Sequence, residues 1–164
     1  PTVPRAASGS MAGMELDHAG LEILPRGECL ALLSTVPIGR IGLSLSALPV
    51  VLPVNFAVHD ESIIIRTSHG SKFSAALTSS VVALEADHYD TIGHNGWSVL
   101  VQGSSRVVDD IGELERLRRL PLRPWANPDT DRFIAISTDL VSGRRVRGWY
   151  RPDGHEAFQR ITAR

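Results

Sequence analysis

The feature that most constrains the fold is a series of three apolar segments, joined by very short connections, between residues 38 and 67. Residues 38–45 (IGRIGLSL) alternate between apolar and small or polar side chains, which is typical of a strand with one buried face. Two further strands are predicted over 49–58 and 61–67, each after only a few connecting residues. Because parallel strands need a crossover of about a dozen residues, these connections predict an antiparallel meander of hairpins.

The third of these strands carries three consecutive isoleucines, Ile63, Ile64 and Ile65. Successive side chains of a strand point to opposite faces, so this strand is apolar on both sides. A one-sided sheet would leave one of those faces in water, whereas a barrel strand covered by a helix or a partner subunit would bury both. The sequence therefore predicts a barrel whose third strand lies between the interior and a second packed surface.

The remaining segments predict more strands and short helices. The helix that begins at Asp110 has the clearest start, because Asp110 can cap it and Glu113 follows three residues later. Its apolar stripe stops at Pro121, which ends the helix. We expect further helices at 28–34 and 70–77, and further strands at 81–86, 97–108, 133–136 and 141–146. The predicted fold class is α+β, mainly β: a six-stranded antiparallel barrel with short helices.

The two ends of the chain set the expected domain boundaries. Residues 1–13 mix Pro, Ala, Ser and Gly around Val3-Pro4-Arg5, so they resemble a tag remnant, with a native start at Met11 or Met14. Residues 14–147 form the predicted barrel domain, and residues 148–164 form a loosely held C-terminal tail.

Composition excludes several classes of function. The chain has 164 residues and a net charge of −1 with its charges interspersed, so no global field attracts nucleic acid or an anionic membrane. The single cysteine, Cys29, excludes an internal disulfide framework and a zinc site built from several thiolates, and its apolar neighbours predict that it is buried. No apolar run is long enough for a membrane span and no secretory signal is visible, so we expect a cytoplasmic protein.

The most informative polar segment is residues 66–72, which follow the isoleucine strand directly and open the predicted helix at 70–77. Unpaired backbone amides at a helix start, the close approach allowed by Gly70, and the charges of Arg66 and Lys72 would together suit a phosphate group. The alternative is a capped helix beside a solvated basic pair, since Ser, Thr and Gly are also routine capping residues. Both interpretations remain open at this point.

Two other polar groups have structural explanations that we favour. Asn55 is a lone polar residue in an apolar strand, and its amide could meet the edge of a heterocycle or simply bond to nearby backbone. Asp87, His88, Asp90 and His94 are expected to cluster in one loop, but their spacing matches no known set of metal ligands. We therefore predict no metal site.

Several segments, taken in order, resemble one family. They look like the flavin-binding split barrels related to pyridoxamine 5′-phosphate oxidase, in particular its small actinobacterial members, over residues 15–147. The segments are 38–41, 49–55, 65–72, 96–103 and 120–126.

The resemblance implies a homodimer of split barrels with flavin mononucleotide (FMN) in grooves between the subunits. It implies phosphate binding by one set of residues, contact with the isoalloxazine ring by a second set, and a tryptophan that reaches or covers the cofactor. These residues are, in that order, Arg66, Thr67, Ser71 and Lys72; Val54, Asn55 and Ser98; and Trp125. The basic substrate-clamping segment of the vitamin B6 oxidases is missing from this chain, so vitamin B6 oxidation is not expected.

The resemblance favours a flavin-dependent oxidoreductase that acts on a small organic substrate, with no catalytic residue identified because the flavin carries the redox chemistry. One alternative is a deazaflavin-dependent reductase of the same fold. Another is a non-catalytic protein that binds flavin, or binds haem through His69 or His59. A pure dimerisation module is the remaining alternative.

Overall fold

The computed structural model describes residues 15–67, 77, 78, 80–122 and 132–148. Within these residues it is a mainly β protein with two short helices, α1 (Arg26–Leu33) and α3 (Ile111–Leu117). The strands are β1 (Glu22–Leu24), β2 (Ile38–Leu45), β3 (Leu48–His59), β4 (Ser62–Thr67), β5 (Val81–Asp90), β6 (Asn95–Val107), β7 (Arg132–Ile136) and β8 (Leu140–Val146). No helix in the described part of the chain is long and apolar enough to cross a membrane.

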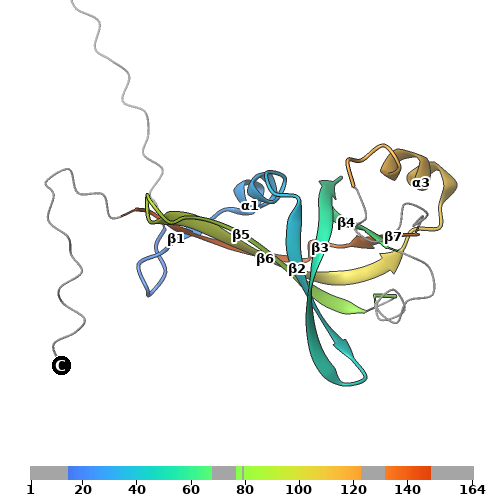
Figure 1. The fold of residues 1–164 in the computed structure, drawn as a ribbon, viewed down its shortest axis with the longest axis horizontal. Coiled ribbons are helices and arrows are strands. Elements are labelled where there is room, and N and C mark those ends of the chain that lie inside the picture. Colours follow the sequence, from blue (N-terminus) through green and yellow to red (C-terminus); the bar gives the residue numbers. More distant parts are fainter. Residues whose placement is uncertain (1–14, 68–76, 79, 123–131, 149–164) are drawn as a thin grey trace, which may run out of the picture.

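Strands β2 to β7 close into an antiparallel barrel. The strand order is β1-β8-β6-β5-β2-β3-β4-β7, and an additional pairing of β6 with β7 closes the ring. Strand β8 adds to the outer edge of β6, and β1 adds to β8, so that the sheet continues beyond the barrel as a long arm (Figure 1). The predicted six-stranded antiparallel barrel with short helices is confirmed.

Tight hairpins generate the predicted meander. Two residues separate β2 from β3, and Ser46 and Ala47 have φ values of 52° and 63°. Asp60 and Glu61 separate β3 from β4 and also have positive φ values. Positive φ at both central residues is the feature of a type I′ turn, whose twist matches that of the flanking strands. The predicted strand over 38–45 therefore has the observed bounds, and the second turn lies one residue later than expected.

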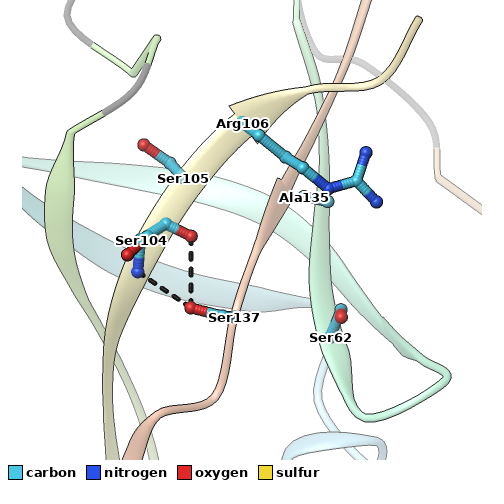
Figure 2. A pocket seen from close by; sticks show the side chains of 6 residues that line it. All are labelled: Ser62, Ser104, Ser105, Arg106, Ala135 and Ser137. Carbon is cyan, nitrogen blue, oxygen red and sulfur yellow. Dashed lines mark hydrogen bonds between the residues drawn. The ribbon is translucent and has the colours of Figure 1, made fainter.

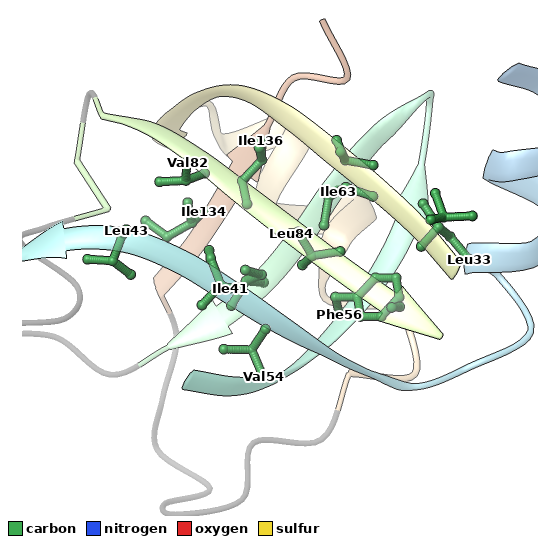
Figure 3. Close-up of a cluster of buried hydrophobic side chains, with 14 of the residues drawn as sticks. Leu33, Ile41, Leu43, Val54, Phe56, Ile63, Val82, Leu84, Ile134 and Ile136 are labelled. Carbon is green, nitrogen blue, oxygen red and sulfur yellow. The ribbon is translucent and has the colours of Figure 1, made fainter. Parts of the chain in front are cut away.

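The isoleucine strand is buried on both faces, as predicted. Ile63 lies in the barrel interior with Ile41 and Phe56 (Figure 3). Ile65 belongs to the same buried cluster. Ile64 belongs to a second cluster outside the barrel, which includes Leu117 of α3. Helix α3 is thus the second packed surface of β4.

The capping prediction for α3 is also correct, although the helix is shorter than expected. The Asp110 Oδ1 atom accepts a hydrogen bond from the backbone N–H of Glu113 at 2.7 Å. The regular helix ends at Leu117 rather than near residue 120. The helix predicted at 70–77 lies mostly outside the described residues.

Helix α1 packs on β8 through a very close contact. Cys29, which is fully buried as predicted, lies against Gly143 of β8. Burial raises the pKa of the Cys29 thiol above its ordinary value. Strand β1, which was not predicted, lies beside this contact and pairs with β8 from Glu22 to Leu24.

Candidate functional site

The first part of the candidate site lies where β3 stops pairing with β2 and begins to pair with β4. Strand β3 pairs with β2 from Leu48 to Asn55 and with β4 from Phe56 to His59. The ladder between β3 and β4 ends at the Phe56–Ile65 pair, so Asn55 and Arg66 are the next residues on each strand. The fold therefore brings together Asn55 and the start of the predicted phosphate segment.

The side chains of Asn55 and Arg66 each have a partner in the described structure. The Asn55 amide donates to the carbonyl of Pro37 over 3.4 Å, a long hydrogen bond that agrees with the structural explanation favoured for Asn55. The Arg66 guanidinium lies over the ring of Phe133, 5.5 Å from its centroid. The backbone of Thr67 lies opposite that of Arg132 at the end of β4. The Asn55 amide and the Arg66 guanidinium thus lie side by side on the outer face, whereas Thr67, one residue further along β4, belongs to the opposite face.

The other predicted site residues on this side have different placements. The Val54 side chain is buried in the barrel core, so only its backbone faces outward. Ser71, Lys72, Trp125 and His69 lie outside the described residues, and their predicted roles stay predictions.

The second part of the candidate site lies on the outer face of the sheet, around Ser98 of β6. Ser98 is exposed and lies directly opposite Asp87 of β5 on one side and Arg144 of β8 on the other. Asp87 accepts a hydrogen bond from Arg40 Nη1 at 2.5 Å, and this contact raises the pKa of Arg40. The Arg144 Nε atom donates to the Asp17 carboxylate at 2.8 Å. Ser98 is therefore a hydroxyl between two ion pairs.

The two parts share one face of the sheet. Asn55 lies opposite Ile38 on β2, and Arg40, two residues along, lies opposite Glu85 on β5. Alternation along each strand then places Asn55 on the same face as Ser98. The two residues are three strand spacings apart, about 14 Å at about 4.8 Å per strand. No single side chain bridges that distance, so a ligand would have to extend across the face to meet both.

Exposed apolar side chains also lie on this outer face. Ile38, Val51 and Val81 are 46%, 66% and 79% exposed, and Ile38 is directly opposite Asn55. An exposed apolar face is a candidate for contact with another molecule.

One pocket lies elsewhere on the barrel, between β4, β6 and β7 (Figure 2). It has a volume of about 180 Å³ and is lined by Ser62, Ser104, Ser105, Arg106, Ala135 and Ser137. Cofactor sites occupy roughly 300–1,000 Å³. The backbone N–H of Ser104 donates to Ser137 Oγ at 2.9 Å, and Arg106 donates to Glu113 at 2.6 Å. This pocket is too small for a flavin.

The prediction that Asp87, His88, Asp90 and His94 share one loop is wrong. Asp87, His88 and Asp90 belong to β5, which continues to Asp90 by pairing with β6. His94 lies in the turn that follows, with its Nδ1 atom 3.3 Å from the Tyr89 hydroxyl. The described residues contain no group of three or more side chains that could hold a metal ion.

Comparison with known proteins assigns the chain to a family. Residues 25–145 match the family model described as pyridoxamine 5′-phosphate oxidase. The chain belongs to the pyridoxamine 5′-phosphate oxidase family. The matched region contains every predicted site residue, and it confirms the resemblance seen in the sequence.

One curated protein and two solved structures are similar to this pyridoxamine 5′-phosphate oxidase family member over most of its chain. The uncharacterized protein Rv0080 of Mycobacterium tuberculosis is 41% identical over 128 residues, which are 75% of this chain and 84% of that protein. The FAD binding protein from Mycobacterium smegmatis is 34% identical with a TM-score of 0.67, over 76% of this chain and 97% of that chain. A conserved protein of unknown function from Corynebacterium diphtheriae is 31% identical with a TM-score of 0.63, over 76% and 96% of the two chains.

Proposed function

We propose that this protein is a homodimeric, flavin-binding oxidoreductase that acts on a small organic substrate in the cytoplasm. The observation that carries the proposal is the 34% identity, over most of both chains, to the FAD binding protein from M. smegmatis. The family match over residues 25–145 also supports flavin binding. FMN is the cofactor that we favour, with FAD as the competing flavin.

The described residues fit a flavin phosphate at the end of β4. Arg66 offers a guanidinium on the same face as Asn55, and guanidinium groups suit phosphate oxygens. Ser71 and Lys72 would complete the phosphate segment. The outer face beside Asn55 carries Ile38, an exposed apolar side chain on which a planar ring could stack.

The chain's own residues would bind and orient the cofactor rather than carry out the redox step. A bound flavin supplies the chemistry, because its ring accepts or donates two electrons. Arg66 and Thr67 would hold the phosphate, and Asn55 and Ser98 would donate or accept hydrogen bonds at the ring. The apolar face, once covered, would exclude water from the ring.

A second copy of this chain is the partner we propose for the outer face. An isologous dimer buries the same surface of both subunits. The outer face of each subunit would therefore be covered by the outer face of the other. Sedimentation should give a dimer for the wild type and a monomer for Val51→Glu, which places a charge on that face. Ile111→Glu is the control, because Ile111 is 74% exposed and belongs to α3 rather than to the sheet. A monomeric wild type, or a dimeric Val51→Glu variant, would contradict the proposed interface.

Titration with cofactors tests flavin binding directly. We expect saturable binding of FMN or FAD by absorption and fluorescence, measured beside oxidised and reduced deazaflavin. Arg66→Ala and Lys72→Ala should each weaken binding by about 10–100-fold, since a hydrogen bond to a charged group contributes roughly 1.5–3 kcal/mol. Arg106→Ala is the matched control, because that arginine is already held in an ion pair with Glu113 of α3. Binding of neither flavin would refute the proposal.

The same experiment separates the alternatives. Preference for the deazaflavin would place the protein with deazaflavin-dependent reductases of this fold. A Soret band on addition of haem, lost in His69→Ala, would indicate a haem protein. Flavin that binds but is never reoxidised by any of a panel of small planar acceptors would indicate a non-catalytic flavin carrier.

A further inference from the structure

The hairpin of β2 and β3 extends beyond the strands that flank it. Strand β2 pairs with β5 only from Arg40 to Gly42, and β3 pairs with β4 only from Phe56 to His59. Among the described strands, β3 therefore has β2 as its single neighbour from Leu48 to Asn55. Residues 43–53 form a hairpin arm, and its tip projects from the barrel (Figure 1).

The hairpin arm carries exposed apolar side chains on both faces. Leu48 and Leu52 share the face of Val54, which lies in the barrel core, because side chains alternate along a strand. These two leucines are 68% and 38% exposed. Pro49 and Val51 belong to the opposite face, which is the outer face of the sheet, and both are exposed. A partner that covers only the outer face would leave Leu48 and Leu52 in water.

The arm gains little stability from its own subunit at the tip. Leu43 is buried and Leu45 packs against the core, so the base of the arm is held. In contrast, seven of the eight residues from Ser46 to Pro53 are exposed. A two-stranded hairpin is only marginally stable in water by itself. Cover on both faces would stabilise this part of the hairpin.

The composition of the arm favours a protein as its cover. Residues 41–58 contain no Asp, Glu, Lys or Arg, although 21% of the whole chain is charged. The core of a protein interface is depleted of charged residues, and homodimer interfaces are more apolar than transient ones. A segment that binds an anionic lipid surface would instead combine apolar side chains with Lys and Arg. A second copy of the chain therefore suits the arm better than a membrane.

Two prolines limit how a partner is able to approach the free edge of β3. The backbone N–H of Phe56 donates to the carbonyl of Pro37 over 3.2 Å. Because N–H groups alternate in direction along an antiparallel strand, those of the odd-numbered residues from 49 to 55 point away from β2. Pro49 and Pro53 occupy two of these four positions and have no N–H. An added strand would lack these donors, so the partner meets the side chains on the faces of the arm rather than its edge.

We propose that the hairpin arm inserts into the second copy of this chain, so that both faces of the arm are buried in the dimer. The inference rests on the proposed homodimer and adds the face of Leu48 and Leu52 to the outer face already assigned to it. Val51 joins the two, because it lies on the outer face of the same hairpin. In an isologous dimer the insertion is reciprocal, and each arm enters the other subunit. Asn55 lies at the base of the arm, so insertion also brings the partner subunit next to the candidate site.

The first test is Leu48→Glu, which places a carboxylate on the face that an outer-face dimer alone would leave in water. Sedimentation over a concentration series should show a dimer dissociation constant raised by about 100-fold or more, because a buried carboxylate would have no partner charge. Ile111→Glu is the matched control, since Ile111 is similarly exposed but belongs to α3. Leu48 is exposed in the single subunit, so the change leaves the barrel core intact, and thermal melting checks this.

The second test uses a milder change and measures accessibility. The native Cys29 is fully buried, so a cysteine introduced on the surface is the reactive thiol. Leu48→Cys should react with a maleimide about tenfold more slowly above the dimer dissociation constant than below it, because only the free subunit exposes the arm. Ile111→Cys should react equally fast at both concentrations.

The outcomes separate insertion from the proposed dimer. An unchanged dissociation constant of Leu48→Glu, beside a monomeric Val51→Glu, would overturn insertion and leave the outer-face dimer intact. Equally fast labelling of Leu48→Cys and Ile111→Cys in the dimer would also overturn insertion. A monomeric wild type would refute the dimer and the insertion together, while the flavin titration would still test cofactor binding. If that monomer bound phosphatidylcholine vesicles and Leu48→Glu did not, a lipid surface would be the occupant and insertion would be wrong.

Discussion

Replacement of Gly143 by alanine tests how tightly α1 is packed on β8. An added Cβ would lie 2.6 Å from Cys29 Sγ and 3.1 Å from Leu24 Cδ1, where ordinary contacts are 3.4–4 Å. Both neighbours are buried, so the sulfur would have to move by roughly 1 Å within a closely packed core. The glycine is therefore required by the close approach of the helix.

The expected cost follows from two opposing effects. Overpacking of a filled core costs about 1–3 kcal/mol. Alanine loses less conformational entropy on folding than glycine, which returns roughly 0.5–1 kcal/mol. The net destabilisation of Gly143→Ala should be about 1–2 kcal/mol, measured by urea unfolding. For a domain of this size, that corresponds to a melting temperature lower by about 2–8 °C.

A double-mutant cycle with Cys29→Ala decides whether the steric reasoning is correct. Cys29→Ala alone removes one buried sulfur and should cost about 1 kcal/mol. It also clears the space that the new Cβ needs, so the double variant should be about as stable as Cys29→Ala alone. The coupling energy would then be about 1–2 kcal/mol. Strictly additive effects of the two changes would refute the close-contact explanation.

Gly103→Ala supplies the contrasting case. There the added Cβ would lie 1.8 Å from the backbone oxygen of Ser137, an atom that no side-chain truncation removes. The strand would have to move away from the connection between β7 and β8. We therefore expect a cost of about 3 kcal/mol or more, with no rescue by Ser137→Gly.

Three further predictions concern stability and reactivity. Ala47 has a φ of 63°, which glycine adopts without strain, so Ala47→Gly should raise the free energy of unfolding in urea by about 1 kcal/mol. An unchanged free energy of unfolding would contradict the turn assignment. Asp17 and Glu22 have lowered pKa values, so their stabilisation is present above their ordinary values of 3.8 and 4.5 and is lost as the pH falls further. Asp17→Asn and Glu22→Gln should therefore be less stable than the wild type at pH 7 and should match it in strong acid, whereas a pH-independent difference would exclude ionisation as the cause. Cys29 should react with a thiol reagent only as fast as the protein opens, because burial raises its pKa and the thiolate is the reactive form; rapid reaction of the native protein would show that the site is accessible.

Local sequence patterns predicted the barrel because its strands carry their own signals. The alternation over 38–45 and the short connections after it specify a hairpin whatever the rest of the chain does. The isoleucine strand predicted a second buried surface because two apolar faces need two coverings. The Asp110 cap is likewise a contact between residues three apart in sequence.

Elements that depend on distant partners were missed. Strand β1 has three residues and no apolar alternation, and it is a strand because it pairs with β8 more than 100 residues later. Its sequence signal is the complementarity of Glu22 with Arg145 and Arg147, which no local rule detects. The end of β5 was predicted to be a loop because Asp87 to Asp90 are polar, yet pairing with β6 keeps them extended.

Some residues of the candidate site are placed by local sequence, and others are placed by pairing between strands that are far apart in the chain. Asn55 and Arg66 flank a two-residue turn symmetrically, so a sequence that specifies the hairpin also places these two residues side by side. The position of Ser98 beside Arg144 depends instead on the register of β6 with β8, which the chain reaches only after α3 and β7. Register also decides which arginine of β8 faces outward, because a slip of one residue would exchange Arg144 with Arg145. The ion pairs of Arg145 with Glu22 and Glu28 oppose such a slip, since they can form only on the α1 side. The contacts that attach α1 and β1 to the barrel therefore also fix which arginine of β8 lies on the outer face beside Ser98.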